Sequence, residues 1–262
     1  MAIRDELWWS PYVQDFKQLS TLKDPIASMN KRTPKGAPLI QTAIAYKAMC
    51  INVPRYLLYL QDKAKAMGVK VVKARLPVER GLQHSLTGIK DVVKDSKVDC
   101  YVNATGLGAA KLCKDEAMYP IRGQTVLVKG EAAATQTRIG TGYSAYCIPR
   151  PGSGMSILGG TKQVGNWSEA VDPDTTRLIL QRCSYIVPEL QTGADGGFEV
   201  VSVQCGLRPG RKGGPRMEKE TVGGSKIVHA YGHAGAGYQN SIGSARLVVQ
   251  LVGESLSMSA RL

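Results

Sequence analysis

The segment of this chain best suited to chemistry is a glycine-rich turn near its C-terminus. Gly232, Gly235 and Gly237 follow an apolar stretch at Ile227–Tyr231 and precede a helical pattern that extends to about Leu256. Glycine lets a backbone approach a flat ligand closely, and the start of a helix attracts an anion through its unpaired N–H groups. A phosphate or the N1/O2 edge of a reduced flavin would suit this position. An ordinary tight turn is the alternative, because the glycine spacing is not that of a dinucleotide fingerprint.

Two side chains elsewhere in the sequence are suited to binding a carboxylate. Arg208 stands between Leu207 and Pro209 at the end of an apolar stretch, and a guanidinium can donate two parallel hydrogen bonds to a carboxylate. Tyr146 lies on another apolar stretch, where a half-buried hydroxyl needs a partner that a ligand carboxylate would supply. Taken alone, a surface arginine and a core tyrosine are the commoner interpretations of such residues.

Other kinds of catalytic site find no support in the sequence. There is no Gly-x-Ser-x-Gly nucleophile elbow, no P-loop and no pair of carboxylates suited to acid–base work. The three histidines are too few and too badly spaced to bind zinc, so we expect no metal site. The six cysteines include no Cys-x-x-Cys pair and are typical of reduced thiols in an intracellular protein.

The charge balance is strongly basic, because 34 lysines and arginines stand against 21 acidic residues and give a net charge of +13. Such a balance is compatible with a nucleic-acid partner. The basic residues are scattered, however, and aromatic residues are not interleaved with them as a stacking platform requires. We therefore favour a solvated basic surface and keep nucleic-acid binding as a distant alternative. The apolar stretches fall well short of the roughly 20 residues that span a membrane.

The pattern of apolar residues predicts a mixed α/β fold. Residues 1–45 contain several prolines and predict no regular element. We expect helices at Val53–Met67, Ile89–Lys94 and Asp172–Leu190, and a hairpin that pairs Tyr146–Arg150 with Met155–Gly159. Further strands are expected at Val69–Leu76, Val98–Ala104, Gln124–Lys129 and Phe198–Leu207.

Several stretches, in order from about Trp9 to Leu251, resemble D-amino acid oxidases, most closely the fungal ones. They are Val102–Ala109, Pro120–Gln124, Ala145–Gly152, Gly159–Thr161 with Asn166-Trp167, Gly206–Pro209 and His229–Gln239. The resemblance implies an α/β (α+β) fold that combines a remnant of a Rossmann-like FAD-binding domain with a substrate domain built on a large mixed sheet. The flavin parts would be approximately 45–110 and 200–262, and the substrate domain approximately 120–200.

The resemblance also implies roles for individual residues. Arg208 and Tyr146 would bind the substrate α-carboxylate, and the Gly235 carbonyl and Gln239 would bind its amino group. Lys162 replaces the aromatic or apolar residue common in oxidases of neutral D-amino acids; it is either a solvated lysine or a partner for an acidic side chain, as in D-aspartate oxidases. The residues implied to lie near FAD are Leu76, Thr105, Gly106, Gly232, Gly235, Ala236, Gly237, Tyr238 and Gln239.

The implied reaction is the transfer of a hydride from Cα of a D-amino acid to N5 of FAD. It yields a 2-oxo acid, ammonia and, with oxygen, hydrogen peroxide. No Gly-x-Gly-x-x-Gly segment for the FAD pyrophosphate precedes Trp8 in this sequence. We therefore expect weak FAD binding and keep a catalytically inactive remnant of the oxidase fold as an alternative.

The last three residues, Ala260-Arg261-Leu262, resemble a relaxed Ser-Lys-Leu address. They predict the peroxisomal import receptor as a partner and the peroxisome as the location, with the cytoplasm otherwise. The expected partners are thus a D-amino acid, oxygen and that receptor, without nucleic acid or a membrane, and a homodimer is left open.

Overall fold

The computed structural model describes residues 7–19, 26–33, 39–94 and 97–257. The chain divides into two compact units. Unit 1 contains residues 1–63, 124–161 and 171–204, and unit 2 contains residues 64–123, 162–170 and 205–262. The chain passes from one unit to the other within β4 (Met118–Lys129) and within β9 (Val200–Arg211).

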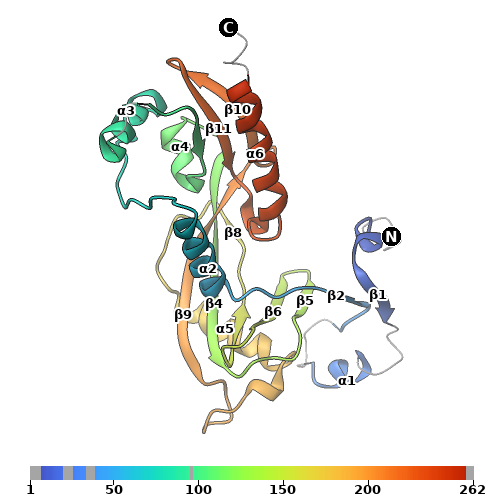
Figure 1. The fold of residues 1–262 in the computed structure, drawn as a ribbon. Coiled ribbons are helices and arrows are strands. Elements are labelled where there is room, and N and C mark those ends of the chain that lie inside the picture. The colour runs from blue at the N-terminus through green and yellow to red at the C-terminus, as the bar shows by residue number, and fades with distance from the viewer. Residues whose placement is uncertain (1–6, 20–25, 34–38, 95–96, 258–262) are drawn as a thin grey trace. The chain divides into compact units, whose positions relative to one another are not determined.

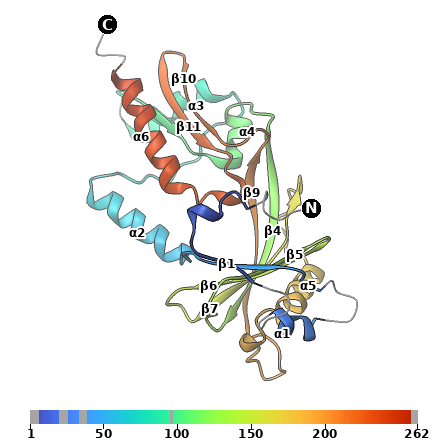
Figure 2. The same ribbon diagram turned by 90° about the vertical axis from the view of Figure 1, so that its right-hand side faces the viewer.

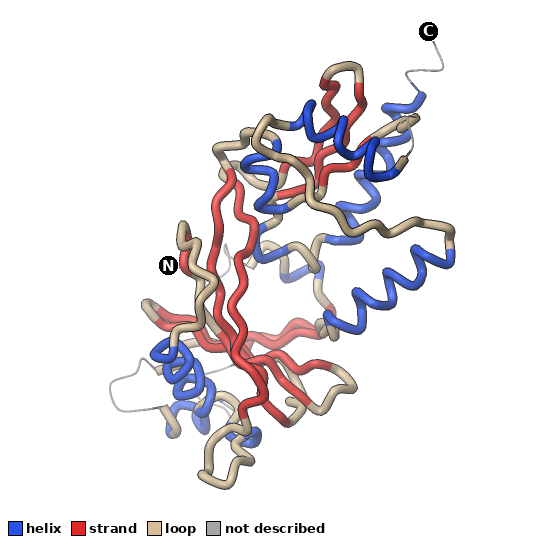
Figure 3. Tube along the Cα trace, turned by 90° about the vertical axis from the view of Figure 1, so that its left-hand side faces the viewer, coloured by secondary structure: helices blue, strands red, loops and turns tan. Residues whose placement is uncertain are grey.

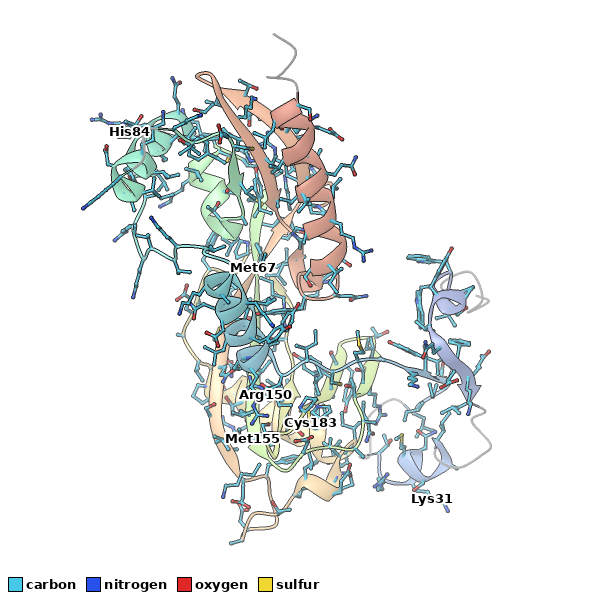
Figure 4. The ribbon with its side chains drawn as sticks, viewed as in Figure 1. Lys31, Met67, His84, Arg150, Met155 and Cys183 are labelled. Carbon is cyan, nitrogen blue, oxygen red and sulfur yellow. The ribbon has the colours of Figure 1, made fainter. Side chains whose placement is uncertain are left out.

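Unit 1 is built on an antiparallel sheet. Strands β5 (Gln136–Gly140), β6 (Tyr143–Arg150) and β7 (Met155–Gly159) follow one another, and β7 pairs with the second half of β4. The β6–β7 hairpin runs in register from Arg150 opposite Met155, side by side in Figure 4, to Tyr146 opposite Gly159. The predicted hairpin is therefore confirmed.

Helix α5 (Pro173–Ser184) covers one face of this sheet and packs against β6 and β7 (Figure 2). It begins where predicted, because the Asp172 carboxylate accepts hydrogen bonds from the N–H groups of Asp174 and Thr175. The predicted helix at Asp172–Leu190 is too long, since Pro188 starts a separate 3₁₀ turn, Pro188–Leu190. The core between helix and sheet consists of Val126, Val128, Ala132, Ala145, Cys147, Leu158, Ile179, Cys183, Ile186, Val187 and Leu190.

Side chains alternate between the two faces of β6, as they do in any strand. Ala145, Cys147 and Pro149 are buried, whereas Tyr146 is half-buried and Ile148 is 37% exposed. The phenol of Tyr146 therefore lies on the face of the sheet opposite to the α5 core.

Unit 2 contains a three-stranded sheet in the order β10 (Arg216–Val222), β11 (Ser225–Tyr231) and β3 (Tyr101–Asn103). The β10–β11 hairpin is antiparallel and appears as paired red tubes in Figure 3, whereas β11 and β3 are parallel. Helix α6 (Ser241–Ser257) runs along β10 and β11 (Figure 1). Two apolar clusters join the sheet to helices α3 (Leu82–Val93) and α4 (Ala109–Leu112): Leu86, Tyr101 and Ile227 in one, and Ala109, Met118 and Tyr231 in the other.

The remaining elements show where the sequence predictions were wrong. Within residues 1–45, expected to be irregular, β1 (Gln14–Leu19) and β2 (Ala43–Lys47) pair, and α1 spans Ile26–Lys31. The segment Val69–Leu76 is not a strand, because a strand needs a neighbour for its backbone groups and no described strand pairs with it. Helix α3 begins at Leu82, seven residues before the predicted start at Ile89.

Helix α2 (Val53–Ala66) is found where it was predicted, but its apolar face is uncovered. None of its residues is buried, and Leu57, Leu58 and Leu60 are 48%, 60% and 43% exposed. Among the residues described, no helix is both long and apolar enough to cross a membrane.

Candidate functional site

The side chain of Arg208, on β9, occupies space that the glycine at position 123 leaves open. Its guanidinium lies against Gly123, where an added Cβ would stand only 2.6 Å from Arg208 Cζ. Any side chain at position 123 would therefore push the guanidinium away. Arg208 is half-buried rather than fully exposed, so the solvated surface arginine that is common in such a position does not describe it.

Three segments far apart in the sequence meet around Arg208 and Pro209 in unit 2. A Cβ on Gly235 would lie 3.7 Å from Arg208 Cδ, and a Cβ on Gly106 would lie 3.9 Å from the ring of Pro209. An isolated bridge between Gly210 and His233 ties the end of β9 to the C-terminal turn. The structure thus brings together the arginine and both glycine turns that the sequence analysis selected separately.

The C-terminal turn presents an open surface. It comprises Gly232, the 3₁₀ turn Ala234–Ala236 and Gly237, followed by α6. Gly232 has φ +89 and a Cβ there would meet Arg211, so glycine is required at this position. Gly237 is helical, and a Cβ there would meet no heavy atom within 4 Å. The side chains of Tyr238 and Gln239 are exposed beside it, so this turn is not filled by packed side chains.

The turn at Thr105–Gly106 is fixed by hydrogen bonds. The Asn103 Oδ1 atom accepts from the Thr105 backbone N–H at 3.2 Å and from the Thr105 hydroxyl at 2.8 Å. Gly106 then takes a positive φ of +57, a conformation open to glycine at little cost. An asparagine at a strand end therefore sets the position of the turn.

Tyr146 lies in unit 1 on a platform of two glycines. A Cβ on Gly160 would stand 2.8 Å from Tyr146 Cζ, and a Cβ on Gly159 would also collide with the ring. Beneath the strand pair, the Cys183 thiol of α5 (Figure 4) lies 3.5 Å from the Tyr146 carbonyl and 3.6 Å from the Gly159 carbonyl. Burial raises the pKa of the Cys183 thiol to about 12, so it stays protonated and inert.

A family model matches most of this chain. The model described as FAD dependent oxidoreductase (DAO) matches residues 14–251 of this chain. The chain belongs to this family. FAD is thus the cofactor of the family to which this mixed α/β chain belongs, and D-amino acid oxidase is the type of enzyme that it resembles.

Individual relatives agree with this family membership. A D-amino-acid oxidase of Schizosaccharomyces pombe is 36% identical over 90% of this chain and 64% of its own length. A D-aspartate oxidase of Talaromyces thermophilus is 35% identical over 79% of this chain and 53% of its own length. The crystal structure of glycine oxidase from Geobacillus kaustophilus has the same fold, with a TM-score of 0.67, 19% identity, and coverage of 96% of this chain and 66% of that chain. The chain spans less than two thirds of the length of the Schizosaccharomyces pombe relative.

The C-terminal turn of this chain leaves room for the flat cofactor of its family. The surface at Gly235–Gln239 is exposed, with the exception of half-buried Ala236, and a side chain at Gly237 would occupy open space. Glycine there leaves the backbone accessible to a planar ring. Leu76 is half-buried on the extended segment before α3, and the strand end at which it was expected does not form.

Lys162 is exposed at the start of the segment 162–170 of unit 2. This segment is anchored by Arg122, which is only 3% exposed. Arg122 donates from Nε to the Ser168 carbonyl at 3.0 Å, from Nη1 to Gln163 Oε1 at 2.8 Å, and from Nη2 to the Ala170 carbonyl. In the sequence Arg122 stands out only as part of a resemblance, because nothing in its neighbourhood marks it as a buried anchor.

Gln124, two residues after Arg122, has a structural role. It is fully buried, its Nε2 donates to the Asp172 carbonyl at 2.8 Å and to Thr176 Oγ1 at 2.9 Å, and its Oε1 accepts from the Asp172 N–H at 2.9 Å. All of these partners belong to the start of α5, so Gln124 fastens that helix to β4. Within the described part of the chain, no group of three or more His, Cys, Asp and Glu side chains is placed to hold a metal ion.

Proposed function

We propose that this chain carries the substrate-binding part, and part of the flavin-binding part, of an oxidase that deaminates D-amino acids. The observation that carries the proposal is the position of Arg208 beside the Gly235 turn, with the Thr105–Gly106 turn against the neighbouring Pro209. A guanidinium there is suited to a substrate carboxylate, and the accessible Gly235 backbone beside it suits a flat redox cofactor. Unit 2 would supply the turns that face the flavin.

The residues would bind and orient the substrate rather than supply a base. Arg208 would donate two hydrogen bonds to the α-carboxylate, and the phenol of Tyr146 would donate a third. The Gly235 carbonyl would accept a hydrogen bond from the amino group, with Gln239 beside it, so that Cα is held in a single orientation. When bound, FAD would supply the chemistry by accepting the Cα hydride and passing the electrons to oxygen.

The substrate class is proposed as D-amino acids generally, with acidic ones as the second candidate. The exposed ammonium of Lys162 and the similarity to a D-aspartate oxidase favour that candidate. An exposed ion pair contributes roughly 0–1 kcal/mol, so Lys162→Met should lower kcat/KM for D-aspartate by at most about fivefold and leave D-alanine unchanged. Equal effects on both substrates would show that Lys162 is a solvated lysine.

The experiment that tests the proposed function is anaerobic reduction of the flavin. The purified chain is incubated with excess FAD and then with D-alanine, D-aspartate or L-alanine, and the visible absorbance is followed. We expect the D-amino acids to bleach the flavin and L-alanine to leave it oxidised. A chain that binds FAD but is bleached by none of the three would be an inactive member of the fold.

The C-terminal tripeptide Ala260-Arg261-Leu262 lies outside the described residues. We propose it as a peroxisomal address on its sequence alone. A fluorescent fusion that keeps a free C-terminus should enter peroxisomes, and deletion of Leu262 should leave it in the cytosol.

A further inference from the structure

The Thr105–Gly106 turn is connected to a buried histidine that has no assigned role. His229 on β11 stands in register opposite Asn103 on the parallel strand β3. His229 is 0% exposed and Asn103 is 6% exposed. The Asn103 Nδ2 atom lies 3.1 Å from His229 Nδ1 and 3.1 Å from the Cys113 thiol, while Asn103 Oδ1 accepts both hydrogen bonds from Thr105.

These contacts determine where the protons are. The Thr105 backbone N–H can only donate, so the atom of Asn103 that faces it must be the carbonyl oxygen. The amide NH₂ of Asn103 therefore points at His229 Nδ1, which must accept. His229 Nε2 then carries the single ring proton and donates it to Glu220 Oε2 at 2.9 Å. The orientation of the turn and the neutral tautomer of His229 are thus two consequences of one arrangement.

Several charged and titratable side chains surround His229, and they form one connected network of hydrogen bonds. Glu220 also accepts from Arg216 Nη2 at 3.1 Å, and Arg216 in turn contacts Glu218 and the Tyr231 hydroxyl. Tyr231 donates to Asp115, which Arg211 also contacts, and Cys113 lies on the Asn103 side. Burial, assisted by the charge of Arg216 and opposed by Glu220 and Glu218, lowers the pKa of His229. The neutral ring that the hydrogen bonds require is therefore the form present at neutral pH.

We propose that Asn103 and His229 are a positioning pair that holds the Thr105–Gly106 turn in place for the flavin, and that they do so only while His229 is neutral. The inference rests on the proposed function for its ligand. A proton on Nδ1 would face the NH₂ of Asn103, so that two donors meet. The pair can relieve this only if the Asn103 amide rotates, and rotation takes its oxygen away from the Thr105 N–H and hydroxyl.

The strands offer variants that separate positioning from mere packing. His229→Gln keeps an acceptor for Asn103 and a donor for Glu220 but cannot be protonated. Asn103→Asp keeps the acceptor for Thr105 and also accepts from a protonated His229, so the turn should stay fixed as the pH falls through the His229 titration. His84→Gln is the matched control, because His84 is an exposed histidine on α3 (Figure 4).

The first measurement does not need FAD. Nitrogen-15 NMR of the histidines should show the Nε2–H tautomer for the signal that is lost in His229→Gln. Hydrogen exchange of the peptide that covers Thr105, corrected for the intrinsic effect of pH, should lose at least about tenfold protection in the wild type as the pH falls through the His229 titration, because the amide loses its acceptor. The His84→Gln variant should behave like the wild type, and His229→Gln and Asn103→Asp should show no loss.

The second measurement is the Kd for FAD by quenching of flavin fluorescence across the same pH range. It should rise about tenfold with protonation in the wild type and stay flat in His229→Gln. An Nδ1–H tautomer, or the same pH-dependent loss in His229→Gln, overturns the positioning pair even if FAD binds. A different outcome is that the tautomer and the hydrogen exchange are as expected but the chain binds no FAD at any pH. That outcome overturns the proposed flavin site, and with it the role of the pair toward FAD.

Discussion

Substitution of Gly123 by alanine tests whether Arg208 binds the substrate carboxylate. A Cβ at this position would lie 2.6 Å from Arg208 Cζ, which is too close for non-bonded carbon atoms. The colliding group is the far end of a flexible side chain, so the guanidinium should move while the strand remains folded. Gly123→Ala is thus a way to displace the charge of Arg208 without removing it.

The size of the effect follows from the hydrogen bonds that the displacement removes. A charge-assisted hydrogen bond contributes roughly 1.5–3 kcal/mol, and two bonds to one carboxylate share part of that energy, so a total of about 3 kcal/mol is reasonable. Since about 1.4 kcal/mol corresponds to a factor of ten, kcat/KM for D-alanine should fall about a hundredfold. D-Alaninamide lacks the carboxylate, and its much lower kcat/KM should change little.

The matched control is Gly206→Ala. Gly206 lies on the same strand two residues before Arg208, and a Cβ there would meet no heavy atom within 4 Å. This variant should resemble the wild type with both substrates, and both variants should unfold at nearly the same urea concentration as the wild type. Equal losses for D-alanine and D-alaninamide, or a loss as large in Gly206→Ala, would mean that Arg208 does not bind the carboxylate.

Three further outcomes are expected from other parts of the chain. Tyr146→Phe should reduce kcat/KM for D-alanine about tenfold, because it removes one hydrogen-bond donor and leaves the ring on its glycine platform; an unchanged value would make the phenol a packing group only. Gly237→Ala should stabilise the fold by roughly 0.4–1 kcal/mol, since its backbone is helical, yet weaken FAD binding, whereas Gly253→Ala in α6 should leave FAD binding unchanged. Cys147 and Cys183 are fully buried with pKa values raised by burial to about 11 and about 12, so neither should react with a thiol reagent at pH 8 until the protein unfolds; rapid modification of these two thiols in the folded protein would contradict this.

Local signals in the sequence predicted the elements that depend on local contacts. The start of α5 was predicted because Asp172 and Pro173 are a capping residue and a first-turn proline, and the structure shows both roles. The β6–β7 hairpin was predicted because its turn residues interrupt two apolar stretches. The segment Val69–Leu76 has the composition of a strand as well, but composition does not provide a partner strand, and among the described residues none pairs with it.

The site depended on contacts that no local signal contains. Arg208 and Gly235 were each selected by residue type, but the role of Gly123 as the floor beneath the guanidinium requires β4 and β9 to be placed first. The resemblance supplied the residue roles without that physical reason. Arg122 was missed as an anchor because a buried arginine in a strand looks the same in sequence as an exposed one.

The Asn103–His229 pair, by contrast, left a signal in the sequence. A histidine inside the apolar stretch Ile227–Tyr231 is expected to be buried, and buried polar groups are almost always hydrogen-bonded. The two residues are 126 positions apart, but each stands near the carboxyl end of an apolar stretch that leads into a glycine turn. Carboxyl ends of parallel strands meet at one edge of a sheet, where ligands commonly bind. A buried histidine and an asparagine at two such ends therefore predict a polar contact beside a ligand turn, and screening the histidines only as zinc ligands overlooked it.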